Sequence, residues 1–191
     1  MLRGASLPLV ATFALVVAGC AGTAVLPSRS GPSAFDESFA IDGRLSARHR
    51  GEVVALAFTW THAATRDEFV VTTPLGLAVA ELSSDALTRR VEVRTADGRR
   101  DEASDWATLT ERVVGFPLPV GGLASWVRGI PRPDAPHGVE MDSAGRAGVL
   151  RQDGCEIVYS YPDDSAARPS RLGLACHDVE IRIVIDKWVA G

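Results

Sequence analysis

The chain has 191 residues, of which 46% are hydrophobic and 23% are charged, and its net charge is −4. This length is typical of one globular domain with a sizeable core. The acidic balance argues against a nucleic-acid-binding protein.

The first twenty residues have the pattern of a bacterial lipoprotein signal. Arg3 precedes a short apolar run at 7–18, and small residues precede Cys20. The run is too short for a spanning helix. A bare signal peptide ends in a small-x-small site, whereas a cysteine directly after small residues resembles a lipobox. We therefore expect residues 1–19 to be a signal peptide and Cys20 to be the lipidated N-terminus.

The residues after Cys20 predict a location. Residues 1–19 hold one arginine and no acid, so the net charge without them is −5. Ala21 stands where, in the familiar bacterial sorting pattern, an aspartate retains lipoproteins in the inner membrane. We expect a lipid-anchored outer-membrane protein that faces the periplasm. Residues 20–34 are typical of a flexible tether, and residues 35–191 form the predicted domain.

Most of the domain alternates apolar and polar residues with the period of half-buried strands. Turn signals such as Arg50-Gly51 and Asp97-Gly98 separate the runs. The pattern predicts strands at 39–49, 53–60, 69–73, 77–82, 87–94, 139–143, 148–152, 155–161, 171–177 and 179–188.

The segment 67–82 predicts a hairpin whose tip is Pro74-Leu75-Gly76. Proline and glycine at these positions fit a type I turn. If Thr73 and Gly76 close the turn, the facing pairs are Val71 with Ala78, Phe69 with Ala80, and Glu68 with Glu81. The last pair is unfavourable. A lone exposed leucine is common, so the turn alone assigns Leu75 no role.

The segment 104–114 changes to a helical period. Trp106, Leu109 and Val113 lie on one helical stripe, Ser104 suits the N-cap, and Gly115 suits the C-terminal cap. A shorter helix is predicted at 121–127. The chain is therefore predicted to be mainly β (α+β). We expect a curved antiparallel half-barrel of about ten or eleven strands, with two or three short helices as a lid over an apolar cavity.

Cys155 and Cys176 remain after lipidation of Cys20. The oxidising periplasm permits a disulfide. The loop at 162–170 centres near residue 166, which places the two cysteines opposite each other if their strands pair. A disulfide and two buried free thiols both fit this pattern.

The sequence offers no signature of catalysis. His49, His62, His137 and His177 lack the spacing of metal ligands. Phosphate-binding loops and nucleophile elbows are absent, and the carboxylates are scattered along strands rather than paired. We therefore expect no enzyme, no metal and no cofactor.

An ordered set of short motifs covers nearly the whole mature chain. The most informative are PLP at 117–119 and LASWVRG at 123–129, just after the first helix. The others are the lipobox, GRL at 43–45, Trp60, PLG at 74–76, QDG at 152–154, Tyr159, PSRL at 169–172 and IVIDKW at 183–188. This set is similar to the outer-membrane lipoprotein receptor LolB family. That family usually has tryptophan where Cys155 stands, a departure that concerns local packing.

The resemblance implies a receptor that accepts lipoproteins from the periplasmic carrier LolA and inserts them into the inner leaflet of the outer membrane. The implied partners are LolA with its cargo, the cargo's acyl chains and outer-membrane phospholipid, and a monomer is expected. In the family, the leucine of the Pro-Leu-Gly loop protrudes and is needed for membrane delivery, and here it is Leu75.

The apolar side of the strands and helices would line the acyl-chain cavity. The candidate lining residues are Phe58, Trp60, Phe69, Val71, Leu109, Val113, Leu123 and Trp126. A dry, fully packed core is the alternative.

Two other kinds of lipoprotein fit the sequence. A lipocalin-like or carrier-type lipoprotein that binds a free lipid would share the cavity, but it would need no apolar loop tip. A structural or sensor lipoprotein of the envelope would bind a protein on its concave face and would copurify with that partner without lipid.

Overall fold

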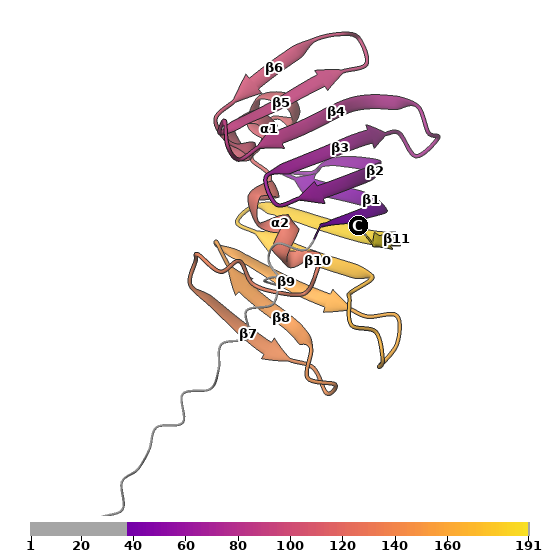
Figure 1. The fold of residues 1–191 in the computed structure, drawn as a ribbon, viewed down its shortest axis with the longest axis vertical. Helices are drawn as coiled ribbons and strands as arrows, with labels where there is room; N and C mark the ends of the chain where they lie inside the picture. Colours follow the sequence, from indigo (N-terminus) through magenta and orange to yellow (C-terminus); the bar gives the residue numbers. More distant parts are fainter. Residues whose placement is uncertain (1–37, 191) are drawn as a thin grey trace, which may run out of the picture. The chain divides into compact units, whose positions relative to one another are not determined.

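The computed structural model describes residues 38–190. The predicted signal peptide at 1–19, Cys20 and the tether at 20–34 lie outside the described residues. The described part contains one antiparallel sheet and two helices (Figure 1). Their bounds are β1 Phe39–His49, β2 Glu52–Ala63, β3 Arg66–Thr72, β4 Ala78–Asp85, β5 Arg90–Thr95, β6 Arg100–Ala103, α1 Trp106–Val114, α2 Val120–Trp126, β7 His137–Met141, β8 Ala147–Gln152, β9 Cys155–Ser160, β10 Arg171–Cys176 and β11 Val179–Ala190.

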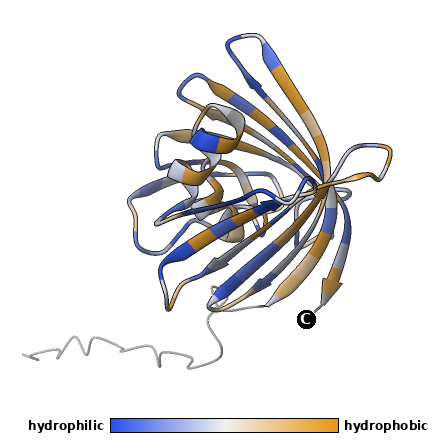
Figure 2. Cartoon of the chain, turned by 90° about the horizontal axis from the view of Figure 1, so that it is seen from above, coloured by the Kyte–Doolittle hydropathy of each residue, from blue (hydrophilic) through white to orange (hydrophobic). Residues whose placement is uncertain are grey.

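The eleven strands form a single open sheet in the order β6-β5-β4-β3-β2-β1-β11-β10-β9-β8-β7. The first and last strands pair along their whole length in the middle of the sheet, from Phe39 opposite Ala190 to His49 opposite Val179. The sheet curves around the two helices, which lie on its concave side (Figure 2). This confirms the predicted fold class.

The concave side is filled unevenly. On β8 to β11 most inward side chains are buried, and five of them are at most 2% exposed, namely Leu150, Ile157, Leu172, Leu174 and Ile181. On β2 to β4 most of the corresponding side chains are only half-buried, as in Leu56, Phe58, Phe69, Val71 and Leu82, although Trp60 is buried. We call β8–β11 the packed half and β2–β4 the hollow half of the sheet.

The β3–β4 hairpin differs from its predicted register. The Gly76 N–H donates to the Thr73 carbonyl at 2.8 Å, the Thr73 N–H donates to the Leu77 carbonyl at 2.8 Å, and Gly76 has φ of +84°. This is a type I turn followed by a glycine bulge. The facing pairs are Phe69 with Leu82, Val71 with Ala80, and Glu68 with Ser83. The predicted pairs were wrong because the bulges insert residues into one strand, and the shift separates Glu68 from Glu81.

Three smaller predictions were also wrong. Leu87 lies in the β4–β5 turn and is 81% exposed, because the Asp85 carboxylate accepts its N–H at 2.8 Å and starts the turn early. The N-cap of α1 is Asp105 rather than Ser104. Strand β6 was missed because its sequence, RDEA, is short and mostly charged.

Candidate functional site

An apolar cavity of about 170 Å³ lies between the concave face of the sheet and the two helices. Its lining residues are Leu45, Leu56, Phe58, Trp60, Phe69, Val71, Val79, Ala80, Leu82, Val93, Trp106, Leu109, Thr110, Val113, Leu118, Val120, Leu123, Val127 and Ile183. Apart from the indole groups of Trp60 and Trp106, Thr110 has the only polar side chain in this set. Its hydroxyl donates to the Trp106 carbonyl at 2.9 Å and accepts the Leu118 N–H at 2.8 Å. The wall therefore offers an apolar ligand no unsatisfied hydroxyl.

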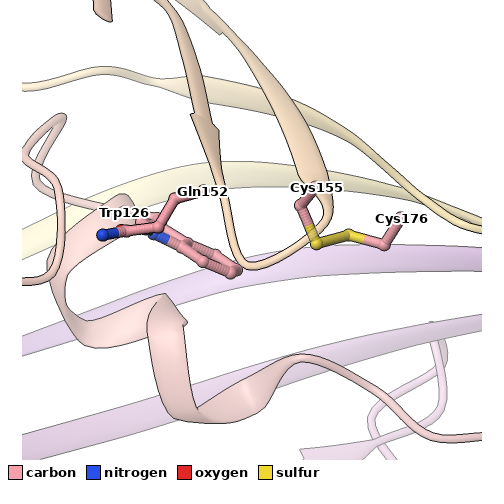
Figure 3. The surroundings of a disulfide bond; sticks show 4 residues. All are labelled: Trp126, Gln152, Cys155 and Cys176. Atoms are coloured by element: carbon pink, nitrogen blue, oxygen red, sulfur yellow. Dashed lines mark hydrogen bonds between the residues drawn. A yellow bond between two sulfur atoms is a disulfide. The ribbon is translucent and has the colours of Figure 1, made fainter. Parts of the chain in front are cut away.

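The structure brings seven of the eight predicted lining residues to this cavity. The exception is Trp126, which is fully buried but faces the packed half. Its indole N–H donates to the Gln152 side-chain oxygen at 2.9 Å. Gln152 also donates to the Arg132 and Ala135 carbonyls at 2.8 and 3.1 Å. Trp126 therefore fixes α2 to the end of β8 instead of lining the cavity (Figure 3).

Glycine and stacked aromatic rings shape the cavity wall. Gly43 faces Phe58 across β1 and β2, and a Cβ at residue 43 would lie 2.8 Å from the Phe58 ring. The ring therefore has room over the β1 backbone only because residue 43 is glycine. Trp60 stacks on Phe69 with centroids 4.7 Å apart, and Phe69 meets Trp106 of α1 edge-on at 5.6 Å. These rings join the sheet to the first helix.

A partly buried polar cluster adjoins the cavity at Trp60. The Asp67 carboxylate accepts the Trp60 indole N–H at 2.9 Å, pairs with His62 Nδ1 at 2.7 Å and accepts the Ser84 hydroxyl at 3.1 Å. In a hydrolytic triad the hydroxyl hydrogen-bonds to the imidazole, whereas here both groups bind the carboxylate. The cluster therefore orients Trp60 and does not activate a nucleophile.

This cluster also lines a larger cleft of about 540 Å³ that opens to solvent. Charged side chains such as Arg66, Asp85, Arg90 and Asp153 share its lining with apolar ones such as Trp106 and Leu118. Arg66 pairs with Glu68 at 2.7 Å, and Arg90 with Glu102 at 3.4 Å. An acyl chain in this cleft would lie beside charged groups and water, whereas the lining of the smaller cavity is almost entirely apolar. The smaller cavity is therefore the candidate site.

The lid consists of α1, α2 and the loop between them. Asp105 caps α1 by accepting the Thr108 N–H at 2.8 Å, and this hydrogen bond holds the pKa of Asp105 below its usual value. The helix lies on β5 and β6, where Leu109 is fully buried. In the connecting loop, the Phe116 ring lies 4.8 Å from the His49 ring. Polar contacts hold the lid as well, because Arg112 of α1 donates to the Asp101 carboxylate at 3.2 Å and to the Glu102 carbonyl at 3.0 Å.

The β3–β4 loop projects beyond the neighbouring strands (Figure 1). Leu75 at its tip is 90% exposed and Leu77 is 67% exposed. Two lining residues, Val71 and Val79, lie at its base. Leu77 was not singled out from the sequence, although a second leucine two residues after the tip was a visible signal.

A disulfide joins Cys155 of β9 to Cys176 of β10, with the sulfurs 2.07 Å apart. These residues face each other in the strand register, and both are at most 6% exposed. Gln152 ends β8 and Cys155 begins β9, so the disulfide and Gln152 lie on opposite sides of the β8–β9 turn (Figure 3). It stabilises the packed half, away from the cavity.

Among residues 38–190, no group of three or more histidine, cysteine, aspartate or glutamate side chains is placed to hold a metal ion. Neither helix of this part is long and apolar enough to cross a membrane.

An open antiparallel half-barrel with a helical lid, an apolar cavity and a projecting apolar loop defines a carrier of apolar ligands. The family model described as outer membrane lipoprotein LolB matches residues 37–188. The outer-membrane lipoprotein LolB of Chromobacterium violaceum is 34% identical over 182 residues, which cover 94% of this chain and 97% of that protein. The LolB of Thiobacillus denitrificans is 33% identical over 183 residues, covering 95% and 96%. The LolB of Azoarcus sp. is 36% identical over 152 residues, covering 78% and 77%. The chain belongs to the LolB family of outer-membrane lipoproteins.

Proposed function

We propose that the protein accepts lipoproteins from the periplasmic carrier LolA and inserts them into the inner leaflet of the outer membrane. The observation that carries this proposal is the cavity, whose lining is apolar and whose one hydroxyl is already satisfied. Transfer of an acyl chain between apolar environments needs no bond to be broken.

The size of the cavity suggests how cargo is held. Its volume of about 170 Å³ is close to that of an engineered cavity of roughly 150 Å³ that accepts benzene. It therefore accommodates a short part of one acyl chain. A triacylated cargo needs more room, and movement of the lid away from the hollow half would supply it. Because each buried methylene contributes roughly 0.8 kcal/mol, incomplete burial keeps the cargo loose enough to pass into lipid.

Two features outside the cavity complete the proposal. Lipidation of Cys20 would hold the mature chain at the membrane where cargo is delivered. Leu75 would enter the lipid during delivery, because a leucine buried there contributes roughly 1.5–3 kcal/mol. That energy favours contact with the membrane but is too small to anchor the protein. The carrier that binds a free lipid remains the rival, since it shares the cavity.

The test is a two-step transfer. The mature chain from residue 20, with Cys20→Ser so that it stays in solution, is mixed with a LolA–lipoprotein complex. Pull-down then shows whether the lipoprotein has changed hands. Liposomes are added next, and flotation shows whether the lipoprotein has moved into lipid. Failure of the first step, together with binding of free fatty acids, would support the rival.

A further inference from the structure

The β3–β4 loop carries an uninterrupted uncharged surface. No charged residue lies between Glu68 and Glu81, and residues 74–78, of sequence PLGLA, are all exposed. A compact exposed patch of this kind marks an interaction site rather than ordinary surface. The sequence motif accounts for the leucine at the tip, whereas Leu77 has no assigned role.

The backbone of this loop suits a low-polarity environment. The N–H groups of Thr73 and Gly76 donate to the Leu77 and Thr73 carbonyls, each at 2.8 Å. The Leu77 N–H donates to the Thr73 hydroxyl at 3.1 Å, and Pro74 has no N–H. Because an unpaired backbone group costs several kcal/mol in hydrocarbon, pairing of these N–H groups lowers the cost of bringing the loop to lipid.

The strand register places the two leucines differently. Val71 and Ala80 face each other on the cavity side, and the next pair, Thr72 and Ala78, points to the opposite side. Val79 is the extra residue of the bulge between these pairs and still lines the cavity. Beyond the last register pair the Thr73 N–H donates to the Leu77 carbonyl, and strand alternation assigns Leu77, the neighbour of Ala78, to the cavity side. Leu77 stands between the cavity wall at Val79 and the tip at Leu75.

We propose that Leu77 forms an apolar lip over which acyl chains pass between the cavity and the membrane, while Leu75 makes the contact with lipid. This inference rests on the proposed function and deepens it. The exposed side chain of Leu77 continues the apolar wall beyond Val79, so a departing chain exchanges protein contacts for lipid contacts with less exposure to water. The lip therefore acts on the rate of passage and not on either end state.

The experiment measures passage and membrane contact separately. The mature chain with Cys20→Ser is loaded with a fluorescently labelled triacylated lipopeptide. It is then mixed with vesicles of phosphatidylethanolamine and phosphatidylglycerol. Transfer is followed by fluorescence dequenching, vesicle association by co-sedimentation, and affinity for the lipopeptide by titration. Leu77→Ser and Leu75→Ser are compared with Leu87→Ser. The last is a matched control, because Leu87 is 81% exposed at the opposite end of β4.

Leu77→Ser is expected to slow transfer about tenfold, which corresponds to about 1.4 kcal/mol. Its vesicle association and its affinity for the lipopeptide should stay within about twofold of the parent, as for other surface substitutions. Leu75→Ser should lower vesicle association and transfer in parallel, and Leu87→Ser should change neither. The lip is refuted if Leu77→Ser transfers as fast as Leu87→Ser, or if it loses association and transfer in the same proportion. A parent chain that fails to bind the lipopeptide would overturn the proposed function itself, and the lip with it.

Discussion

Filling the cavity should make the fold more stable and weaken its affinity for cargo. The substitution Ala80→Leu tests both effects. Ala80 is half-buried on β4, faces Val71 and lines the cavity. The substitution adds three carbons. If all entered the cavity, burial would contribute at most about 2.4 kcal/mol at roughly 0.8 kcal/mol per methylene. Since the site is partly open, about 1 kcal/mol is expected, which raises the melting temperature by about 2–4 °C.

The same substitution should weaken binding of an acyl chain. If the leucine displaces two or three methylenes of the ligand, affinity falls about 15- to 50-fold. Thermal unfolding by circular dichroism and titration with a fluorescent fatty-acid analogue give the two values. Ala55→Leu is the matched control, because Ala55 is exposed on the outer side of β2 and should change neither. If Ala80→Leu leaves affinity intact, the ligand lies elsewhere. If it destabilises the protein, the cavity is already a packed core.

Three further outcomes are expected. Leu75→Glu should leave folding and acceptance of cargo from LolA nearly unchanged but sharply reduce delivery to liposomes, since a charge enters hydrocarbon at high cost; loss of the first step alone would make Leu75 a cavity residue. Replacing Cys155 and Cys176 by alanine should lower the free energy of unfolding, measured in urea, by about 3 kcal/mol, because a cross-link spanning 21 residues restricts the unfolded chain. Cargo acceptance should be retained, and a negligible loss of stability would contradict this prediction. Because the Thr108 N–H lowers the pKa of Asp105, the charged cap should stabilise the fold above the ordinary aspartate pKa. That stability should be lost as pH falls through the lowered value. The pKa is also lowered at Asp97, Asp142, Asp163, Asp178 and Asp186, so both proteins should lose stability in acid. Unfolding from pH 7 to pH 2 should show a smaller loss in Asp105→Asn than in the parent, and equal losses would contradict the role of the cap.

The alternating strands and the helical stripe of α1 could be predicted because each depends on local periodicity. The sequence could not predict which buried side chains of α2 face the cavity and which face the packed half. Leu123 and Trp126 lie three residues apart on one short helix, yet Leu123 lines the cavity while Trp126 bonds to Gln152 on the packed half. Periodicity predicts that both are buried, but the direction in which the Trp126 side chain points depends on Gln152, a partner 26 residues away.

Which half of the sheet is hollow was also beyond sequence patterns. Phe58 and Ile157 occupy equivalent inward positions on their strands, yet Ile157 is fully buried and Phe58 is half-buried. The difference comes from how well the helices fill the two halves, which is a matter of volume and not of alternation. Bulges such as the one at Val79 likewise shift the register by amounts that hydrophobic patterns do not specify.

The pairing of β1 with β11 has a consequence for how the molecule is made. The middle of the sheet joins the first and last strands, so β1 keeps one bare edge until β11 arrives. A chain that emerges N-terminus first presents that edge, together with an uncovered apolar face, for the whole of its synthesis and export. Exposed edges of this kind recruit other strands, and pairing over such a sequence separation is slow. Loss of the last dozen residues would therefore remove the centre of the sheet and not its border. Such a truncated chain should aggregate instead of forming a smaller receptor.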